Sequence, residues 1–230
     1  MQSLRWAFVP TPKKPRRTSR SGPRPTLVLL VRHGKTPTTG NVLPGRAGGL
    51  HLSEVGRAQA DTVAGRIAEL DPRPVAVYAS PLERTRETAA PIARALGLRV
   101  RTDRGLLEAD IGGWTGQRLS RLARSRTWPS VQRWPSGFRF PGGESFTELS
   151  TRCHDAVLGL VAAHRGRTVV AVSHADPIKA VVAKAAGIPL DLFQRLVVSP
   201  CSVTALLYGA GGPHVLCVNS TANLKELALS

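Results

Sequence analysis

The alternation of apolar and polar residues along the chain predicts strands that alternate with helices. Two short apolar runs, at 27–31 and 168–172, fit strands that are buried on both faces. A shorter run at 75–78 fits a third strand. Apolar residues recur at helical spacing at 53–70 and again at 146–166, so each of these segments predicts an amphipathic helix. The pattern as a whole predicts an α/β protein.

Polar side chains follow two of the predicted strands where each strand ends. Arg32 and His33 come directly after the run at 27–31, and His174 follows the run at 168–172 after a single serine. This arrangement is typical of a three-layer α/β/α sandwich with a mostly parallel central sheet and a site at its strand ends. We therefore expect these three side chains to lie close together.

A further cation, Arg84, lies near the start of a predicted helix. Ser80 suits the position that caps a helix N-terminus, and Pro81 suits the first helical position. Arg84 then falls in the first turn, where the helix dipole disfavours a cation unless an anion lies nearby. A phosphate group would supply that anion. Arg86 is interpreted as a solvated neighbour.

The segment at 106–116 contributes a carboxylate, Glu108. It follows two leucines and precedes a Gly-Gly turn, which places it near the end of a strand or loop. Most glutamates are solvated surface residues, so this alternative stands beside a chemical role. Asp110 is the second carboxylate in the segment.

The chain carries a large positive charge. Its formal net charge is +17 over 230 residues, and the segment at 1–25 holds seven basic residues and no acidic one. Scattered prolines and the lack of an apolar period predict that this segment is a disordered basic tail. Both a solvated tail and a nucleic-acid-binding arm are consistent with its composition.

The segment at 114–141 combines aromatic and basic residues. It contains three of the four tryptophans and many arginines. Such a segment would suit a polyanionic or a ring-bearing substrate, or it would form a well-solvated helix, and the sequence leaves these interpretations open.

Two further observations bear on location. No stretch approaches the roughly 18 uninterrupted apolar residues that a membrane-spanning helix needs. The three cysteines are odd in number and lack the paired spacing of metal ligands, which indicates buried thiols in a reducing compartment. We therefore predict a cytoplasmic protein with no membrane partner.

Several motifs together resemble the histidine phosphatases, also called the phosphoglycerate-mutase-like superfamily. They are RHGKT at 32–36, SPLERTRETA at 80–89, Glu108 with the GWTG that follows it, PGGES at 141–145 and SH at 173–174. The resemblance covers residues 26 to about 225. It implies a catalytic domain at 26–230 with the phosphoglycerate-mutase-like fold, and a lid insertion at about 106–145 over the catalytic pocket.

The resemblance also implies a role for each candidate site residue. His33 would attack phosphorus to form a phosphohistidine, and Glu108 would protonate the leaving group. Arg32, Arg84 and His174 would bind the phosphate oxygens, with His174 as a cation. Further substrate contacts are expected from Thr36, Asn41 and Ala175. Asn41 is slightly displaced from the family's position, and Ala175 with Asp176 stands where the family often has Gly-Gly or Gly-Asp.

These roles predict a phosphomonoester hydrolase that acts on a small phosphorylated metabolite. We expect no metal and no cofactor, because the arginines supply the positive charge and would repel a metal cation. The alternatives are a phosphoglycerate-type phosphomutase and a non-catalytic module that binds an anion or nucleic acid. Mutases of the family follow the acidic glutamate with a basic, tyrosine-containing segment, whereas ADIG stands at 109–112 here, which favours a phosphatase.

Overall fold

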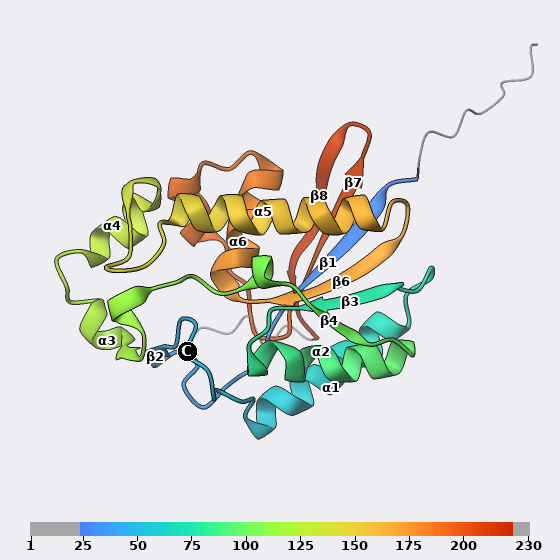
Figure 1. The fold of residues 1–230 in the computed structure, drawn as a ribbon, viewed down its shortest axis with the longest axis horizontal. Helices are drawn as coiled ribbons and strands as arrows, with labels where there is room; N and C mark the ends of the chain where they lie inside the picture. The colour runs from blue at the N-terminus through green and yellow to red at the C-terminus, as the bar shows by residue number, and fades with distance from the viewer. Residues whose placement is uncertain (1–23, 223–230) are drawn as a thin grey trace, which may run out of the picture.

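A six-stranded sheet forms the centre of the protein in the computed structural model, which describes residues 24–222 (Figure 1). In spatial order its strands are β4 (Val100–Thr102), β3 (Ala76–Ala79), β6 (Thr168–Ser173), β1 (Thr26–Arg32), β7 (Val203–Gly209) and β8 (Gly212–Ser220). The first four are parallel, whereas β7 is antiparallel to β1 and β8 is antiparallel to β7. A separate antiparallel pair consists of β2 (Val42–Leu43) and β5 (Gln117–Arg118).

Helices cover both faces of the central sheet (Figure 1). Helices α1 (Glu54–Ala68) and α2 (Glu83–Leu96) pack against each other on one face. Helices α5 (Phe146–Ala163) and α6 (Ala175–Ala186) do the same on the other face. This architecture confirms the predicted three-layer α/β/α sandwich with a mostly parallel central sheet.

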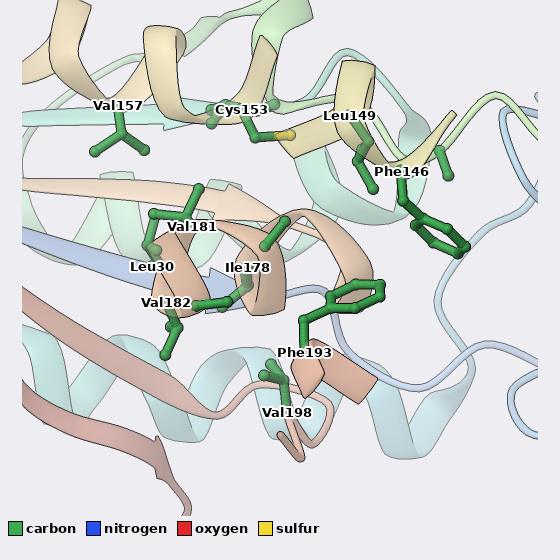
Figure 2. Close-up of a cluster of buried hydrophobic side chains, with 14 of the residues drawn as sticks. Leu30, Phe146, Leu149, Cys153, Val157, Ile178, Val181, Val182, Phe193 and Val198 are labelled. Carbon is green, nitrogen blue, oxygen red and sulfur yellow. The ribbon is translucent and has the colours of Figure 1, made fainter. Parts of the chain in front are cut away.

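The two faces of β1 explain why the fold has a hydrophobic core on each side of the sheet. Successive residues of a strand point to opposite faces. Val28 and Leu30 belong to the core under α5 and α6, whereas Leu29 and Val31 belong to the core under α1 and α2. Figure 2 shows Leu30 among side chains of α5 and α6. Burial on both faces is the reason that this run is apolar without interruption.

The start of α2 differs from the prediction. The helix begins at Glu83 with Leu82 at the N-cap, and no side chain caps it, so the prediction that Ser80 caps this helix is wrong. The Ser80 hydroxyl is used elsewhere, because its Oγ lies 2.9 Å from Nε2 of His174. Arg84 still falls in the first helical turn, as predicted, and Arg86 is exposed.

The segment between β4 and α5, which contains the predicted lid, consists of short elements (Figure 1). They are η1 (Arg104–Leu106), η2 (Gly112–Trp114), β5, α3 (Leu119–Leu122), α4 (Trp128–Arg133) and η3 (Pro135–Gly137), and one more 3-10 helix, η4 (Leu190–Arg195), follows α6. The predicted basic tail lies outside the described residues except for its last two.

The cysteines and the membrane prediction can be compared with the fold directly. Cys153 and Cys201 are buried, but Cys217 is exposed on β8, so the expectation of buried thiols is wrong for Cys217. Within the described part of the chain, no helix is both long enough and apolar enough to cross a membrane.

Candidate active site

His33 and His174 lie side by side at the carboxyl ends of two neighbouring parallel strands. The register between β1 and β6 pairs Arg32 with Ser173, so the two histidines follow their strands at the same level. The backbone N–H of His33 donates to the carbonyl of Ser173 at 3.0 Å, which extends the ladder by one residue. The imidazole rings pack edge to face with centroids 5.2 Å apart. The sheet therefore brings together two residues that are 141 positions apart in the sequence.

The hydrogen bonds of His33 determine which ring nitrogen is nucleophilic. Its Nδ1 lies 2.8 Å from the carbonyl oxygen of Gly34, and a carbonyl only accepts, so Nδ1 carries the proton. Nε2 then keeps a lone pair. Burial, together with the positive charges of Arg32 and Arg84, lowers the pKa of His33 to about 3. The imidazole is therefore neutral at every ordinary working pH.

Gly34 fixes the position of the loop that follows His33 through contacts with two helices. The backbone N–H of Gly34 donates to Oγ1 of Thr88 on α2 at 3.0 Å. A Cβ at Gly34 would lie only 2.5 Å from the carbonyl oxygen of Gly56 on α1, so no side chain fits there. The glycine thus permits a close approach of the loop to α1, while its N–H joins the loop to α2. Both contacts fix the backbone next to His33.

His174 is fully buried and is held by Ser80. Its Nε2 lies 2.9 Å from the Ser80 hydroxyl, whereas its Nδ1 has no hydrogen-bond partner among the residues that the structure describes. Burial lowers the pKa of His174, and the nearby charges of Arg84 and Arg32 act in the same direction. The protein groups around it favour the neutral imidazole, in contrast to the cation that the sequence analysis expects.

Arg32 and Arg84 each use one guanidinium nitrogen in a hydrogen bond to a backbone carbonyl and keep further N–H donors unused. Nη1 of Arg32 donates to the carbonyl of Val198 at 2.7 Å, and Nη2 of Arg84 donates to the carbonyl of Gly45 at 2.8 Å. Within the described chain, Nε of Arg32 and both Nε and Nη1 of Arg84 are buried without a partner. Buried donors without partners cost free energy, and an anion with several acceptor oxygens would satisfy them.

Glu108 lies close enough to these arginines to interact with them electrostatically, and its pKa is raised. Its Oε1 accepts the backbone N–H of Ala109 at 2.9 Å, and its Oε2 lies 4.0 Å from Nδ1 of His174. Burial raises the pKa of Glu108 to about 7, and the negative charge of Asp176 adds to that effect. A carboxyl with this pKa is protonated in a large fraction of molecules at neutral pH, which is what a general acid requires.

Three charged residues that the sequence analysis did not assign to the site hold the Glu108 segment. Glu144 accepts from Arg46 at 3.0 Å and from Arg152 at 2.7 Å, and it also accepts the backbone N–H of Asp110. Nε of Arg46 donates to the Glu108 carbonyl at 2.8 Å. Glu144 belongs to the PGGES landmark, which was a usable signal, but nothing local in the sequence marks Arg46 or Arg152.

A cavity of about 370 Å³ opens next to these groups. Arg32, His33 and Glu108 line it, as do Thr36 and Ala175, two of the predicted substrate contacts. Asn41 does not line it. The Asn41 side chain is exposed, whereas its backbone carbonyl accepts the N–H of Leu119 and its backbone N–H donates to the carbonyl of Thr38. The structure therefore places Arg32, His33, Thr36, Glu108 and Ala175 at the cavity. His174, which packs against His33, and Arg84, which donates to the lining residue Gly45, are fully buried and do not line it, and Asn41 stays outside.

The described residues contain no group of three or more His, Cys, Asp or Glu side chains placed to hold a metal ion. Glu108 and the two histidines are surrounded by arginines instead, and a positive environment suits an anion.

Comparison with known proteins decides the family. A profile of the histidine phosphatase superfamily (branch 1) matches residues 28–221. The chain belongs to the histidine phosphatase superfamily. This confirms the resemblance drawn from the sequence motifs.

Individual curated proteins resemble the chain over most of its length. It is 34% identical over 204 residues to the bifunctional protein Rv2228c of Mycobacterium tuberculosis, covering 87% of this chain and 55% of that protein. The chain thus spans about half the length of this relative. It is 30% identical to phosphoserine phosphatase 1 of Hydrogenobacter thermophilus over 209 residues, or 86% of this chain and 94% of that protein.

A solved structure gives the same picture. The mycobacterial glucosyl-3-phosphoglycerate phosphatase Rv2419c superposes with a TM-score of 0.78 at 26% identity, covering 86% of this chain and all of the other. The superfamily and these phosphatase relatives support a phosphatase, as the sequence predicted.

Proposed function

We propose that this histidine phosphatase hydrolyses phosphomonoesters of small metabolites through a phosphohistidine on His33. The proposal rests on one observation: buried nitrogens of Arg32, Arg84 and His174 have no hydrogen-bond partner among the described residues. They accompany a His33 ring that is neutral, so that its Nε2 has a free lone pair. A phosphomonoester dianion offers oxygens that match these donors. The donors would bind the phosphoryl group with its phosphorus in reach of Nε2.

The first step transfers the phosphoryl group to the protein. Nε2 of His33 attacks phosphorus, the N–P bond forms, and the bond between phosphorus and the ester oxygen breaks. The carboxyl of Glu108 gives its proton to the departing oxygen, so the product leaves as a neutral alcohol. Nδ1 of His33 keeps its proton on the Gly34 carbonyl throughout and disperses the developing positive charge.

The second step returns the protein to its starting state. Water attacks the phosphorus, the Glu108 carboxylate takes a proton from that water, and the N–P bond breaks to release inorganic phosphate. The charges of Arg32 and Arg84 stabilise the phosphoryl oxygens in both steps. Nδ1 of His174 serves as a donor if Ser80 donates its hydroxyl hydrogen to Nε2, and a bound dianion opposes the lowering of the His174 pKa.

The test is phosphate release by the full chain in EDTA across a panel of phosphomonoesters. We expect His33→Ala to abolish release, whereas His214→Ala, which removes an exposed histidine on β8, leaves it unchanged. Quenching the wild type during turnover with alkaline detergent should trap a phosphoryl group that is stable to base and labile to acid, and His33→Ala should lack it. Release that persists in His33→Ala would refute the proposal.

The same assay separates a phosphatase from the alternative functions. A phosphatase incorporates one oxygen of solvent water into the released phosphate, whereas a phosphomutase returns the phosphoryl group to a product and releases little. A non-catalytic module would bind phosphate without turnover. The cytoplasmic location and the lid role of residues 106–145 stay predictions, which the assay does not address.

A further inference from the structure

Beyond the phosphate end, one wall of the cavity is aromatic and aliphatic. Trp114, Trp128, Phe140, Leu119 and Val131 all line it. The rings of Trp114 and Trp128 are stacked with centroids 6.2 Å apart, and Phe140 meets Trp114 edge to face at 5.5 Å. This packing gives the cavity a preformed apolar surface, and such surfaces favour ring-bearing ligands because aromatic rings bury a large area in a defined geometry.

Two further lining residues carry charges that cancel. Apart from Arg32, His33 and Glu108, the charged side chains among the described lining residues are Asp176 and Lys179. Nζ of Lys179 lies 3.5 Å from Oδ1 of Asp176 and donates to Oε1 of Gln194 at 3.0 Å. The side chains of Lys179 and Asp176 are 15% and 29% exposed, so this ion pair is partly shielded from solvent. This part of the lining is therefore polar without a net charge.

The other cations near the cavity do not change this balance. Arg46 is neutralised by Asp110 and Glu144. The lid arginines that have no ion-pair partner among the described residues are exposed and do not line the cavity; they are Arg118, Arg121, Arg124, Arg126 and Arg133. Apart from Arg32, which is assigned to the phosphate, the described lining residues offer no unpaired cation to a polyanionic leaving group. A ring-bearing leaving group would find aromatic lining residues instead.

We propose that the alcohol released by this enzyme is an uncharged, ring-bearing molecule, and that Asp176 selects it by neutralising Lys179. This inference rests on the phosphatase function proposed above. A leaving group with a carboxylate would place that charge on the apolar wall or beside Asp176, at a cost in desolvation or repulsion. A ring would instead lie against Trp114 and Trp128, and the burial of apolar surface on both the ring and the protein would favour binding.

The first experiment compares benzyl phosphate with 2-phosphoglycolate, whose leaving group carries a carboxylate and no ammonium, in the full chain. Both are esters of primary alcohols, so the comparison reports the binding of the leaving group more than its acidity. We expect kcat/KM to be at least about tenfold higher for benzyl phosphate, which a partly buried ring readily provides. An equal or higher value for 2-phosphoglycolate would overturn the inference and leave the phosphatase function intact. Release of phosphate from no monoester at all would overturn both.

Variants test the charged pair and the aromatic lining separately through the ratio of the two kcat/KM values. Asp176→Asn removes the carboxylate that pairs with Lys179, so the ratio should shift toward 2-phosphoglycolate by about tenfold. Because both substrates use the same Glu108, the ratio cancels the effect of Asp176 on that carboxyl. Asp155→Asn, an exposed carboxylate on α5, is the matched control and should leave the ratio unchanged. A ratio that does not move in Asp176→Asn would overturn the selecting role.

The aromatic lining of the cavity is tested with a matched pair of tryptophan variants. Trp128→Ala removes a ring that lines the cavity, whereas Trp134→Ala removes one that is 61% exposed and does not line it. We expect Trp128→Ala alone to lower kcat/KM for benzyl phosphate, mainly through a higher KM, with little effect on 2-phosphoglycolate. Equal losses on both substrates would indicate that Trp128 only stabilises the fold and would refute the subsite.

Discussion

The hydroxyl of Ser80 lies 2.9 Å from Nε2 of His174, and both side chains are fully buried. Ser80 directly follows β3, and its backbone N–H donates to Val172 on β6 at 3.0 Å. The hydroxyl is thus rigidly placed, and when it donates to Nε2 it makes Nδ1 the protonated nitrogen of His174. A residue that the sequence analysis treats as a helix cap therefore orients a ring in the candidate active site.

Ser80→Ala should lower kcat without unfolding the protein. The variant removes one buried hydrogen bond and leaves His174 free to adopt either tautomer, so we expect kcat to fall about fivefold, the equivalent of about 1 kcal/mol. Steady-state kinetics measure this, and circular dichroism checks the fold. Ser120→Ala, at an exposed position on α3, is the control. Unchanged kcat in Ser80→Ala would mean that the contact is structural only.

Arg84→Met should separate anion binding from stability. The guanidinium has no exposed surface and two unpartnered nitrogens within the described chain, so its burial costs free energy until an anion is bound. Without phosphate, the variant should be at least as stable as the wild type. Inorganic phosphate at 100 times its Kd should stabilise the wild type by about 2.7 kcal/mol and the variant by much less.

Thermal unfolding with and without phosphate measures both effects. Arg86→Met, which removes the exposed neighbour on the same helix, should match the wild type in both conditions. A variant at Arg84 that loses stability yet keeps the full phosphate response would contradict the assignment of this arginine to the anion.

Activity should decline above about pH 7 because Glu108 must be protonated in the first step. A carboxyl whose pKa is raised to about 7 holds its proton below that pH and loses it above, so kcat/KM falls as pH rises through 7. His33, with its pKa lowered to about 3, is already neutral across this range and adds no loss between pH 4 and pH 7. The acidic side of the profile then reflects ionisation of the substrate phosphate, near pH 6.

Glu108→Gln provides the check on this assignment. The amide cannot supply a proton, so the decline above pH 7 should disappear, and kcat for an alkyl ester should fall by about 10² to 10⁴. An ester of 4-nitrophenol, whose leaving group needs no proton, should be affected far less. A decline that persists in Glu108→Gln would assign it to another group.

Glu144→Gln should loosen the segment that carries Glu108. The carboxylate accepts from Arg46, Arg152 and the Asp110 backbone, and its side chain is only 13% exposed. We expect the free energy of unfolding to fall by about 1–3 kcal/mol and kcat to fall by tenfold or more, because Glu108 is no longer held in place. Glu148→Gln breaks an exposed pair with Arg139 and should cost less stability and no activity. Denaturant unfolding and kinetics measure both, and an unaffected kcat in Glu144→Gln would contradict the role.

Much of the fold and site could be predicted from the sequence because the signals are local. The uninterrupted apolar run in β1 reports burial on both faces, and this needs no knowledge of the partner strands. His33 and His174 each follow such a run directly, so the rule that parallel strands end at one edge was enough to bring them together. The family motifs added Arg84 and Glu108.

Tertiary structure alone decided the details that tune the chemistry. Ser80 is a partner of His174, and not the predicted helix cap, because β3 lies beside β6. Arg46 donates a hydrogen bond to Glu144, although the two residues are 98 positions apart in the sequence. The charge on the cavity wall depends on whether Lys179 meets Asp176, and the protonation of each site residue depends on its burial. Hydrogen bonds and pKa values depend on the distances between side chains, whereas a sequence pattern specifies only which element each side chain belongs to.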